Sequence, residues 1–212
     1  MEGNQRHEAV WNARYRDAGD DYLFGKTPAT FLARREKLFS KGERVFLVGD
    51  GDGRNSVWLA ERGLEVMTID IAAVAVEKAI SLAASRKVKI TTAIGDVTMP
   101  DWPPVDLHNR FDWVLGIFIQ FVGGTKRARQ FDAIKQLIRP GGRLLLHGYT
   151  PKQLDYKTGG PASLENLYTQ KMLLEEFTNW EIEELIDYEE ELAEGSRHNG
   201  RSALIGLIAR KP

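Results

Sequence analysis

The chain has 212 residues, of which 42% are hydrophobic and 28% charged, and its 29 Lys and Arg residues nearly balance its 30 Asp and Glu residues. This length fits one domain, and the near-zero net charge argues against a nucleic-acid-binding protein, which carries a basic surplus. The absence of cysteine excludes disulfides, thiolate metal sites and a cysteine nucleophile. No apolar stretch approaches the ~20 residues of a membrane-spanning helix, and the chain starts without an apolar leader, so we expect a cytoplasmic protein that does not engage a membrane.

The predicted elements form an alternation of strands and helices. Residues 8–39 are rich in aromatic side chains and are predicted to form two short helices around a turn at residues 25–28. From residue 44 onward, short apolar runs alternate with segments of helical periodicity, which is typical of a parallel sheet covered on both faces. The predicted strands are 44–49, 65–70, 88–94, 111–118 and 143–147, and the predicted helices are 55–62, 72–86 and 125–138.

The end of the chain has a different pattern. Residues 180–188 alternate apolar and acidic side chains, and residues 202–209 are apolar, with a turn region at 195–200 between them. This pattern predicts an antiparallel hairpin at the edge of the sheet. Eight acidic residues lie from Glu181 to Glu194. They would suit a basic partner, but protection of an edge strand from aggregation is the favoured interpretation.

A glycine-rich turn follows the first predicted strand, where residues 48–55 read VGDGDGRN. Alternate glycines allow a sharp turn and let a ligand approach the backbone closely. The spacing departs from the G-x-G-x-x-G of dinucleotide-binding proteins, because Arg54 or Ser56 stands where the third glycine belongs. Asp50 and Asp52 flank the turn and would repel a pyrophosphate, although not a cationic ligand. A purely structural turn is the alternative.

Two further carboxylates follow neighbouring strands. Asp70 ends the second strand, 19 residues after Gly51, where a carboxylate can accept hydrogen bonds from a ribose. Its alternative role is to cap the helix that begins near Ala72. Asp96 follows the third strand and could accept from the amine of adenine, or simply stabilise a turn. Because the carboxyl ends of parallel strands meet at one edge, these features are expected to lie together.

Taken together, these pieces resemble the class I S-adenosylmethionine-dependent methyltransferases. The matching segments are 48–53, 68–70, 95–97, 111–116 and 137–142. Within that superfamily the chain looks most similar to the tellurite-resistance and thiopurine-methyltransferase-like branch. The segments that carry this second resemblance are 11–15, 22–25, 53–55, 148–153, 158–161 and 194–200.

The resemblance implies an α/β, Rossmann-like, doubly wound sheet of seven strands in the order 3-2-1-4-5-7-6, with strand 7 antiparallel and helices on both faces. It implies a single methyltransferase domain over residues 1–212, with an N-terminal helical lid at 1–40 and the core at 41–212. The implied cofactor is S-adenosylmethionine, and the implied product is S-adenosylhomocysteine. The residues implied to bind it are Trp11, Gly49, Asp50, Gly51, Gly53, Arg54, Asp70, Ile71, Asp96, Val97 and Ile117.

Each of these residues has an implied role. The turn at 49–53 would hold the methionine portion, Asp70 the ribose, and Asp96 with Val97 the adenine. Ile71 and Ile117 would sandwich the base. Trp11 would close over the methionine end.

The acceptor pocket is expected between the N-terminal aromatic segment, residues 149–161 and the hairpin turn. His147 stands where related sequences often carry an acid, and it would be a base or, more simply, a core histidine. His198 is expected to be a solvated turn residue if it does not bind substrate. Gly160 belongs to a Gly-Gly-Pro turn that can present backbone amides to an anion. The substrate candidates are Tyr15, Tyr22, His147, Tyr149, Gln153, Tyr156, Gly160 and His198.

The predicted activity is methyl transfer from S-adenosylmethionine to a small-molecule acceptor by in-line displacement. No catalytic residue is assigned, because an activated methyl group needs alignment more than it needs a base. We predict no metal, since the four histidines lack metal-ligand spacing. A nicotinamide-dependent oxidoreductase and a non-catalytic S-adenosylmethionine-binding protein are the alternatives. The expected partner is a small-molecule acceptor, not nucleic acid or a membrane, for a monomer or homodimer.

Overall fold

A computed structural model describes residues 2–195 and 197–212, and it contains a seven-stranded sheet in the order β3-β2-β1-β4-β5-β7-β6. β1 to β5 pair in parallel, and β7 runs antiparallel to both of its neighbours. The predicted fold class, strand order and direction of strand 7 are therefore confirmed. The strands are β1 (Arg44–Val48), β2 (Glu65–Asp70), β3 (Thr91–Ile94), β4 (Phe111–Ile117), β5 (Ile138–Tyr149), β6 (Glu181–Glu194) and β7 (His198–Arg210).

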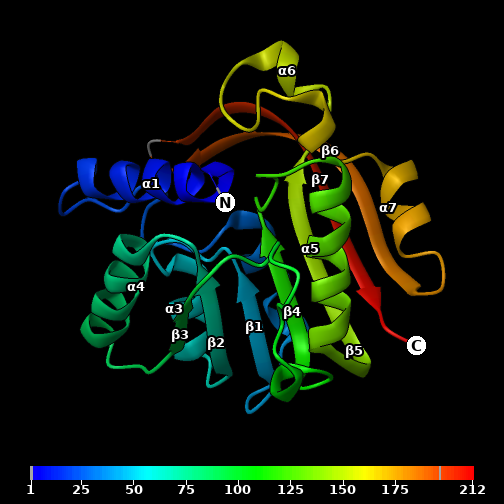
Figure 1. Cartoon of the computed structure of the whole chain (residues 1–212), viewed down its shortest axis with the longest axis horizontal. Coiled ribbons are helices and arrows are strands. Elements are labelled where there is room, and N and C mark those ends of the chain that lie inside the picture. Colours follow the sequence, from blue (N-terminus) through cyan, green and yellow to red (C-terminus); the bar gives the residue numbers. More distant parts are fainter. Residues whose placement is uncertain (1, 196) are drawn as a thin grey trace.

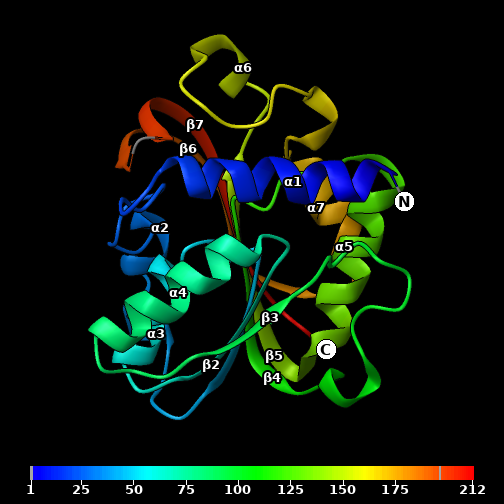
Figure 2. The ribbon, with the colours of Figure 1, turned by 60° about the vertical axis from the view of Figure 1, so that its left-hand side comes forward.

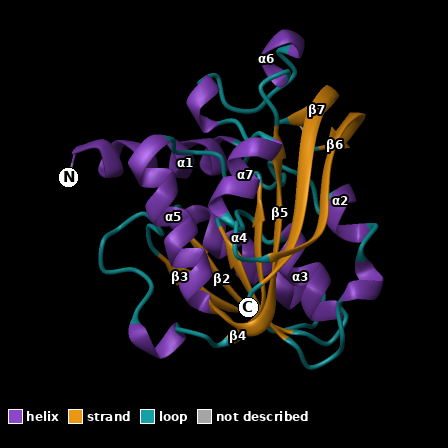
Figure 3. Ribbon diagram, turned by 90° about the vertical axis from the view of Figure 1, so that its right-hand side faces the viewer, coloured by secondary structure: helices purple, strands orange, loops and turns teal. Residues whose placement is uncertain are grey.

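Helices cover both faces of this sheet (Figure 3). On one face, α5 (Gly124–Leu137) and α7 (Gln170–Glu176) bury Phe131 and Leu173 against the strands. On the other face, α2 (Thr30–Ala33) and α3 (Arg54–Glu61) bury Phe31 and Leu59. α4 (Ala73–Ser85) lies beside α3 and β2. The central strands read as nearly continuous apolar runs because both of their faces are buried.

The helix α1 (Glu2–Asp17) lies across the carboxyl ends of the strands, as Figures 1 and 2 show. It is tied to α4 where the Val74 backbone N–H donates to Asn12 Oδ1 over 3.0 Å. The aromatic-rich start of the chain therefore forms one long helix and the four-residue α2 instead of the two short helices predicted for 8–39. A single turn of 3-10 helix, η1 (Glu36–Leu38), completes this region.

The predicted hairpin is present and longer than expected. Its ladder runs from Glu181 paired with Arg210 to Glu194 paired with His198, so the turn is shorter than the predicted region 195–200. Six of the eight acidic side chains of β6 form salt bridges with cations of this same chain, as in Arg34–Glu190, Arg35–Glu184 and Arg143–Glu183. Arginine and lysine residues of this chain are thus the basic partners of these acids.

Between β5 and β6 the chain forms α6 (Gln153–Tyr156) and η3 (Leu164–Asn166), which the sequence analysis left unassigned. β3 begins at Thr91 and not at Val88, because Val88 and Ile90 pack with α3 and α4. Another 3-10 turn, η2 (Val105–Leu107), precedes β4. In the part of the chain that the structure describes, no helix is long and apolar enough to cross a membrane.

Candidate functional site

The glycine-rich turn after β1 brings the backbone close to α1. Gly49 and Gly51 both adopt positive φ angles, of 60° and 67°. A Cβ atom on Gly51 would lie only 2.5 Å from the hydroxyl oxygen of Tyr15, which is buried on α1. Position 51 therefore requires glycine for two reasons. Other residues rarely adopt a positive φ angle, and any side chain at this position would collide with Tyr15.

Asp70, at the end of β2, fixes this turn. Its Oδ2 accepts a hydrogen bond from the Gly51 N–H at 2.9 Å, and its Oδ1 accepts from the Ala72 N–H at 2.8 Å. The carboxylate therefore stabilises the segment that leads into α4 and also orients the glycine turn. Burial raises the pKa of Asp70, although the two backbone bonds oppose that shift.

Two more buried carboxyls flank the turn. Burial raises the pKa of Asp50 to about 7, while hydrogen bonds from the Ser56 hydroxyl and backbone N–H favour its ionised form. Asp52 accepts a hydrogen bond from the Leu23 N–H at 2.8 Å, and burial raises its pKa as well. The turn is thus surrounded by groups whose negative charge is costly unless a cation compensates it.

A cavity opens above these groups, and we call it the inner cavity. It encloses about 1150 Å³, including the part open to solvent. Every residue predicted to bind the cofactor lines it, with the exception of Gly53. Gly53 instead packs against α4, because a Cβ there would approach Ala79 Cα to 2.8 Å. Tyr15 also lines the inner cavity. The predicted cofactor residues that line it are Trp11, Gly49, Asp50, Gly51, Arg54, Asp70, Ile71, Asp96, Val97 and Ile117.

Asp96 reaches the inner cavity from the segment that follows β3. Its Oδ1 accepts from the backbone N–H of Thr98 at 2.7 Å and from the Thr98 hydroxyl at 2.8 Å. These two bonds hold the carboxylate in place, so Asp96 does stabilise its turn. The same position leaves Asp96 on the wall of the inner cavity, where a role in binding adenine would also require it. Asp70 and Asp96 end neighbouring strands, which places both carboxylates on one cavity.

A second hollow, the outer cavity, adjoins the first and encloses about 1850 Å³ with its solvent-open part. Tyr149, Gly160 and His198, which were predicted to bind substrate, line it. The two cavities share a wall made mostly of rings. The residues that line both are His7, Trp11, Phe24, Phe118, Phe121 and His198.

His198 is buried and not a solvated turn residue, so that part of the prediction is wrong. Its side chain is 8% exposed, and its ring centroid lies 4.1 Å from that of Phe118 and 4.6 Å from that of Phe24. The residue is the first of β7, and its pairing with Glu194 carries it inward. Burial lowers the pKa of His198 to about 3, so the imidazole is neutral at physiological pH.

Gln153 supports the outer cavity from behind without lining it. Its side-chain amide donates to the carbonyl of Gly159 at 3.1 Å and to the Thr158 hydroxyl at 3.0 Å, and its oxygen accepts from the Ala203 N–H at 2.8 Å. Gly160 has a φ of +82°, and a Cβ there would meet the ring of Tyr149 at 2.8 Å. The sequence thus holds a glycine pair against an aromatic ring at the cavity wall.

Three other predicted substrate residues lie away from both cavities. His147 is buried in the sheet, with its ring stacked on Phe31 at 4.4 Å between centroids and its Nε2 2.9 Å from the Tyr188 hydroxyl. Burial holds the pKa of His147 well below its ordinary value. Tyr22 donates to the carbonyl of Lys78, and Tyr156 donates to Glu189.

The sequence analysis missed four residues of the shared wall. His7 accepts a hydrogen bond from the indole N–H of Trp11 at 3.1 Å, and the spacing of four residues on one helix was a signal for that pair. Phe118 has a φ of +58°, directly after β4, which turns its ring toward the cavities. Phe24 and Phe121 carry no such signal. Among the residues described, no group of three or more acids or histidines could hold a metal ion.

Comparisons with known proteins agree with this geometry. Residues 45–142 match the family model described as a methyltransferase domain. None of the curated proteins compared with the chain matches it. A structure from work on the conversion of a disulfide bond into a thioacetal group during echinomycin biosynthesis is 17% identical, with a TM-score of 0.79 over 97% of this chain and 92% of its own.

Two further solved structures share the fold. A TehB-like SAM-dependent methyltransferase from Corynebacterium glutamicum is 14% identical, with a TM-score of 0.63 over 98% of this chain and 100% of its own. The cyclase SpnF is 16% identical, with a TM-score of 0.71 over 99% of this chain and 96% of its own. At such identities the likeness shows the fold alone. The family match shows a methyltransferase domain over residues 45–142, and the strand order agrees with the predicted fold of the class I S-adenosylmethionine-dependent methyltransferases.

Proposed function

We propose that the chain transfers a methyl group to a small-molecule acceptor by in-line displacement, with the cofactor in the inner cavity and the acceptor in the outer one. The observation that carries this proposal is the shared wall of the two cavities, which meet at Trp11, Phe118 and His198. A group at this boundary would face the outer cavity directly. Two ligands could therefore bind in line, as a displacement requires.

The residues of the inner cavity fit a positively charged sulfur nucleoside. Asp70 and Asp96 would hold the ribose and the adenine, while Asp50 would offset the positive charge beside the glycine turn. When bound, the cofactor would supply a methyl carbon on a cationic sulfur. A lone pair of the acceptor would form the new bond to that carbon, and the electron pair of the broken carbon–sulfur bond would stay on sulfur. Any proton on the acceptor atom would leave to bulk solvent.

The residues of the shared wall would align the acceptor and exclude water. The rings of Phe118 and Phe24 flank His198, and Trp11 reaches over the boundary from α1. With its pKa at about 3, His198 is a poor proton acceptor, so its ring packs against the ligands and does not act as a base. Alignment and desolvation are then the main contributions of the protein.

Binding and turnover test this proposal together. Isothermal titration should show saturable binding of S-adenosylmethionine and none of NADH. Incubation of the protein with a metabolite extract and methyl-labelled S-adenosylmethionine should yield S-adenosylhomocysteine and a labelled product in the mass spectrum.

Asp96→Asn should weaken cofactor binding about tenfold, by loss of a charged acceptor, whereas Asp101→Asn, at an exposed position, should not. Saturable NADH binding without S-adenosylmethionine binding would contradict the proposal, and tight binding without turnover would favour the non-catalytic alternative.

A further inference from the structure

The two cavities differ in the sign of their charge. The inner cavity is lined by three carboxyls, those of Asp50, Asp70 and Asp96, and by two cations, of which Arg54 is paired with Glu194 and Lys126 is exposed. The outer cavity is lined by Arg6, Arg14 and Arg197, and no aspartate or glutamate of the described chain lines it. Two hollows that share one wall therefore present opposite potentials to their ligands.

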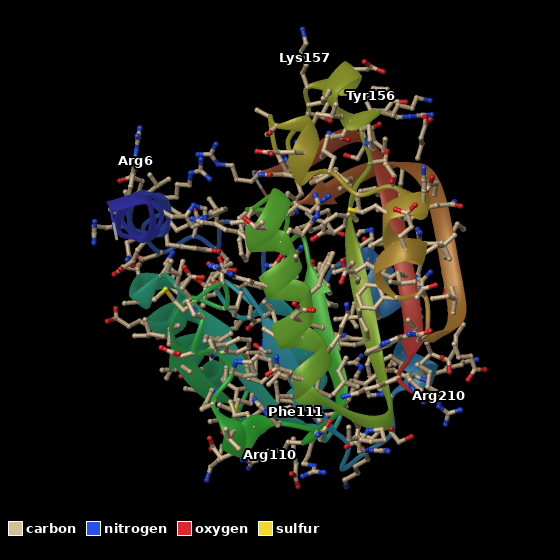
Figure 4. The ribbon with its side chains drawn as sticks, turned by 45° about the vertical axis from the view of Figure 1, so that its right-hand side comes forward. Arg6, Arg110, Phe111, Tyr156, Lys157 and Arg210 are labelled. Carbon is tan, nitrogen blue, oxygen red and sulfur yellow. The ribbon has the colours of Figure 1, made fainter. Side chains whose placement is uncertain are left out.

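Among the described residues, the three arginines of the outer cavity have no acidic partner. None of them forms a salt bridge with a described residue, whereas the nearby Arg201 is paired with Glu189 and Arg34 with Glu190. All three side chains are exposed. They come from two separate elements, because Arg6 and Arg14 stand on α1 and Arg197 precedes β7. Figure 4 shows Arg6 on α1, the helix that lies across the carboxyl ends of the strands. Unpaired guanidinium groups that converge on one hollow favour an anionic ligand.

The remaining wall of the outer cavity combines aromatic rings with the polar side chains of Gln120, Thr158, Ser163 and Asn166. The ring centroids of Phe118 and Tyr149 lie 4.8 Å apart. Gly159 and Gly160 pass close to the ring of Tyr149 and carry no side chain that could cover it. The guanidinium carbon of Arg14 lies 4.7 Å from the centroid of the Trp11 ring, at the shared wall. Rings and guanidinium planes of this kind stack well on a planar ligand.

We propose that the methyl acceptor is a planar aromatic anion, bound with its ring against Phe118 and its anionic group toward Arg14 and Arg197. This inference rests on the proposed function, because it takes the outer cavity as the acceptor site. It excludes neutral acceptors and bare inorganic oxyanions as the best ligands. The anionic group would lie at the open side of the cavity, and the accepting atom would lie at the wall shared with the inner cavity.

Two probes of equal shape test the proposal. The protein is saturated with S-adenosylhomocysteine, and the binding of 2-naphthoate and of 2-naphthamide is measured by isothermal titration. The anion should bind about tenfold more tightly than the amide, because charge-assisted bonds to arginine are the stronger ones. Arg14→Gln and Arg197→Gln should each weaken 2-naphthoate binding several-fold and weaken 2-naphthamide binding by a smaller factor. Arg16→Gln is the matched control, since this exposed arginine on α1 lines neither cavity.

Equal binding of the two probes would overturn the proposal, as would an effect of Arg16→Gln as large as that of Arg14→Gln. Tighter binding of sodium tellurite or inorganic phosphate than of 2-naphthoate would also overturn it, because the aromatic wall would then contribute nothing. Binding of S-adenosylhomocysteine is recorded first in every experiment. Loss of S-adenosylhomocysteine binding would contradict the proposed function. If S-adenosylhomocysteine still binds but 2-naphthoate and 2-naphthamide bind equally, only the proposed acceptor class is contradicted.

Discussion

Arg54 and Glu194 form a buried salt bridge that ties the glycine turn to the hairpin. Arg54 Nη1 lies 2.8 Å from Glu194 Oε2, and the two side chains are only 4% and 5% exposed. Arg54 also donates to the carbonyl of Phe24, while Glu194 Oε1 accepts from the Thr30 N–H at 2.7 Å. One ion pair therefore connects the first residue of α3, the last residue of β6 and the segment between α1 and α2.

The first prediction concerns this pair. Glu194→Gln leaves Arg54 buried without a charged partner, and it should lower the free energy of unfolding by about 3–5 kcal/mol, as measured in urea. Glu190→Gln is the control, because its partner Arg34 is 57% exposed and such pairs contribute at most about 1 kcal/mol. Equal losses in the two variants would show that burial of the Arg54 pair is unimportant.

The second prediction concerns Gly51. Gly51→Ala places a methyl group within 2.5 Å of the Tyr15 hydroxyl and forces a side chain into a backbone conformation with positive φ. We expect cofactor affinity to fall at least tenfold in isothermal titration, because the turn must shift by an amount that costs about 1–2 kcal/mol or more.

Two further variants separate the causes of that loss. Tyr15→Phe in the Gly51→Ala background removes the colliding oxygen and should restore part of the affinity. Gly42→Ala carries the same backbone strain, at a φ of +86°, with no atom within 4 Å of the new Cβ. It should lower stability and leave cofactor affinity intact. A loss of affinity in Gly42→Ala equal to that in Gly51→Ala would reject a specific role for the glycine turn.

Much of the fold and of the inner cavity could be predicted from sequence because both follow from local patterns. The apolar runs that end in Gly49 and Asp70 are strands of one parallel sheet, and the carboxyl ends of such strands meet at one edge. This rule alone brings Asp70 and Asp96 to one cavity. The packing of Gly53 against Ala79 could not be predicted, because Ala79 comes from a helix whose packing no local pattern specifies.

The outer cavity was harder to predict because its residues depend on tertiary register. His198 is buried only because the hairpin ladder extends as far as Glu194, and a one-residue slip would turn its side chain to the opposite face. His147 lies within β5 and stacks on Phe31, which is far away in the chain. The residues around His147 and those around Phe31 give no sign of this contact. Gln153 serves as a support because the segment at Thr158 and Gly159 and the strand β7 at Ala203 meet at its side-chain amide.

The third prediction concerns Asp50, whose pKa burial raises to about 7. Below this pH the carboxyl is neutral, and above it the negative charge can offset a cationic sulfur. Affinity for S-adenosylmethionine should therefore rise up to about tenfold as the pH increases through 7, while affinity for S-adenosylhomocysteine, with its neutral sulfur, should change little.

Variants at two positions check this assignment. Asp50→Asn should remove the pH dependence of the ratio of the two affinities. Ser56→Ala removes a hydroxyl that donates to the ionised carboxylate, so it should move the midpoint to higher pH. A pH-dependent ratio that persists in Asp50→Asn would assign the titration to another group.

The fourth prediction concerns His147, whose pKa burial holds well below the ordinary value of 6.5. The unfolded chain takes up a proton on this histidine below pH 6.5 and the folded chain does not, so the stability that His147 confers is present above that pH and is lost as the pH falls. His147→Phe keeps a ring against Phe31 and cannot titrate. The wild-type protein should be the more stable at pH 7.5, and its advantage should shrink by about 1.4 kcal/mol for each pH unit below 6.5 in urea unfolding. Cofactor affinity should be the same in both proteins, because His147 lines neither cavity. A stability difference that is constant from pH 7.5 to 5.5 would show that His147 is protonated in the folded chain as readily as in the unfolded one.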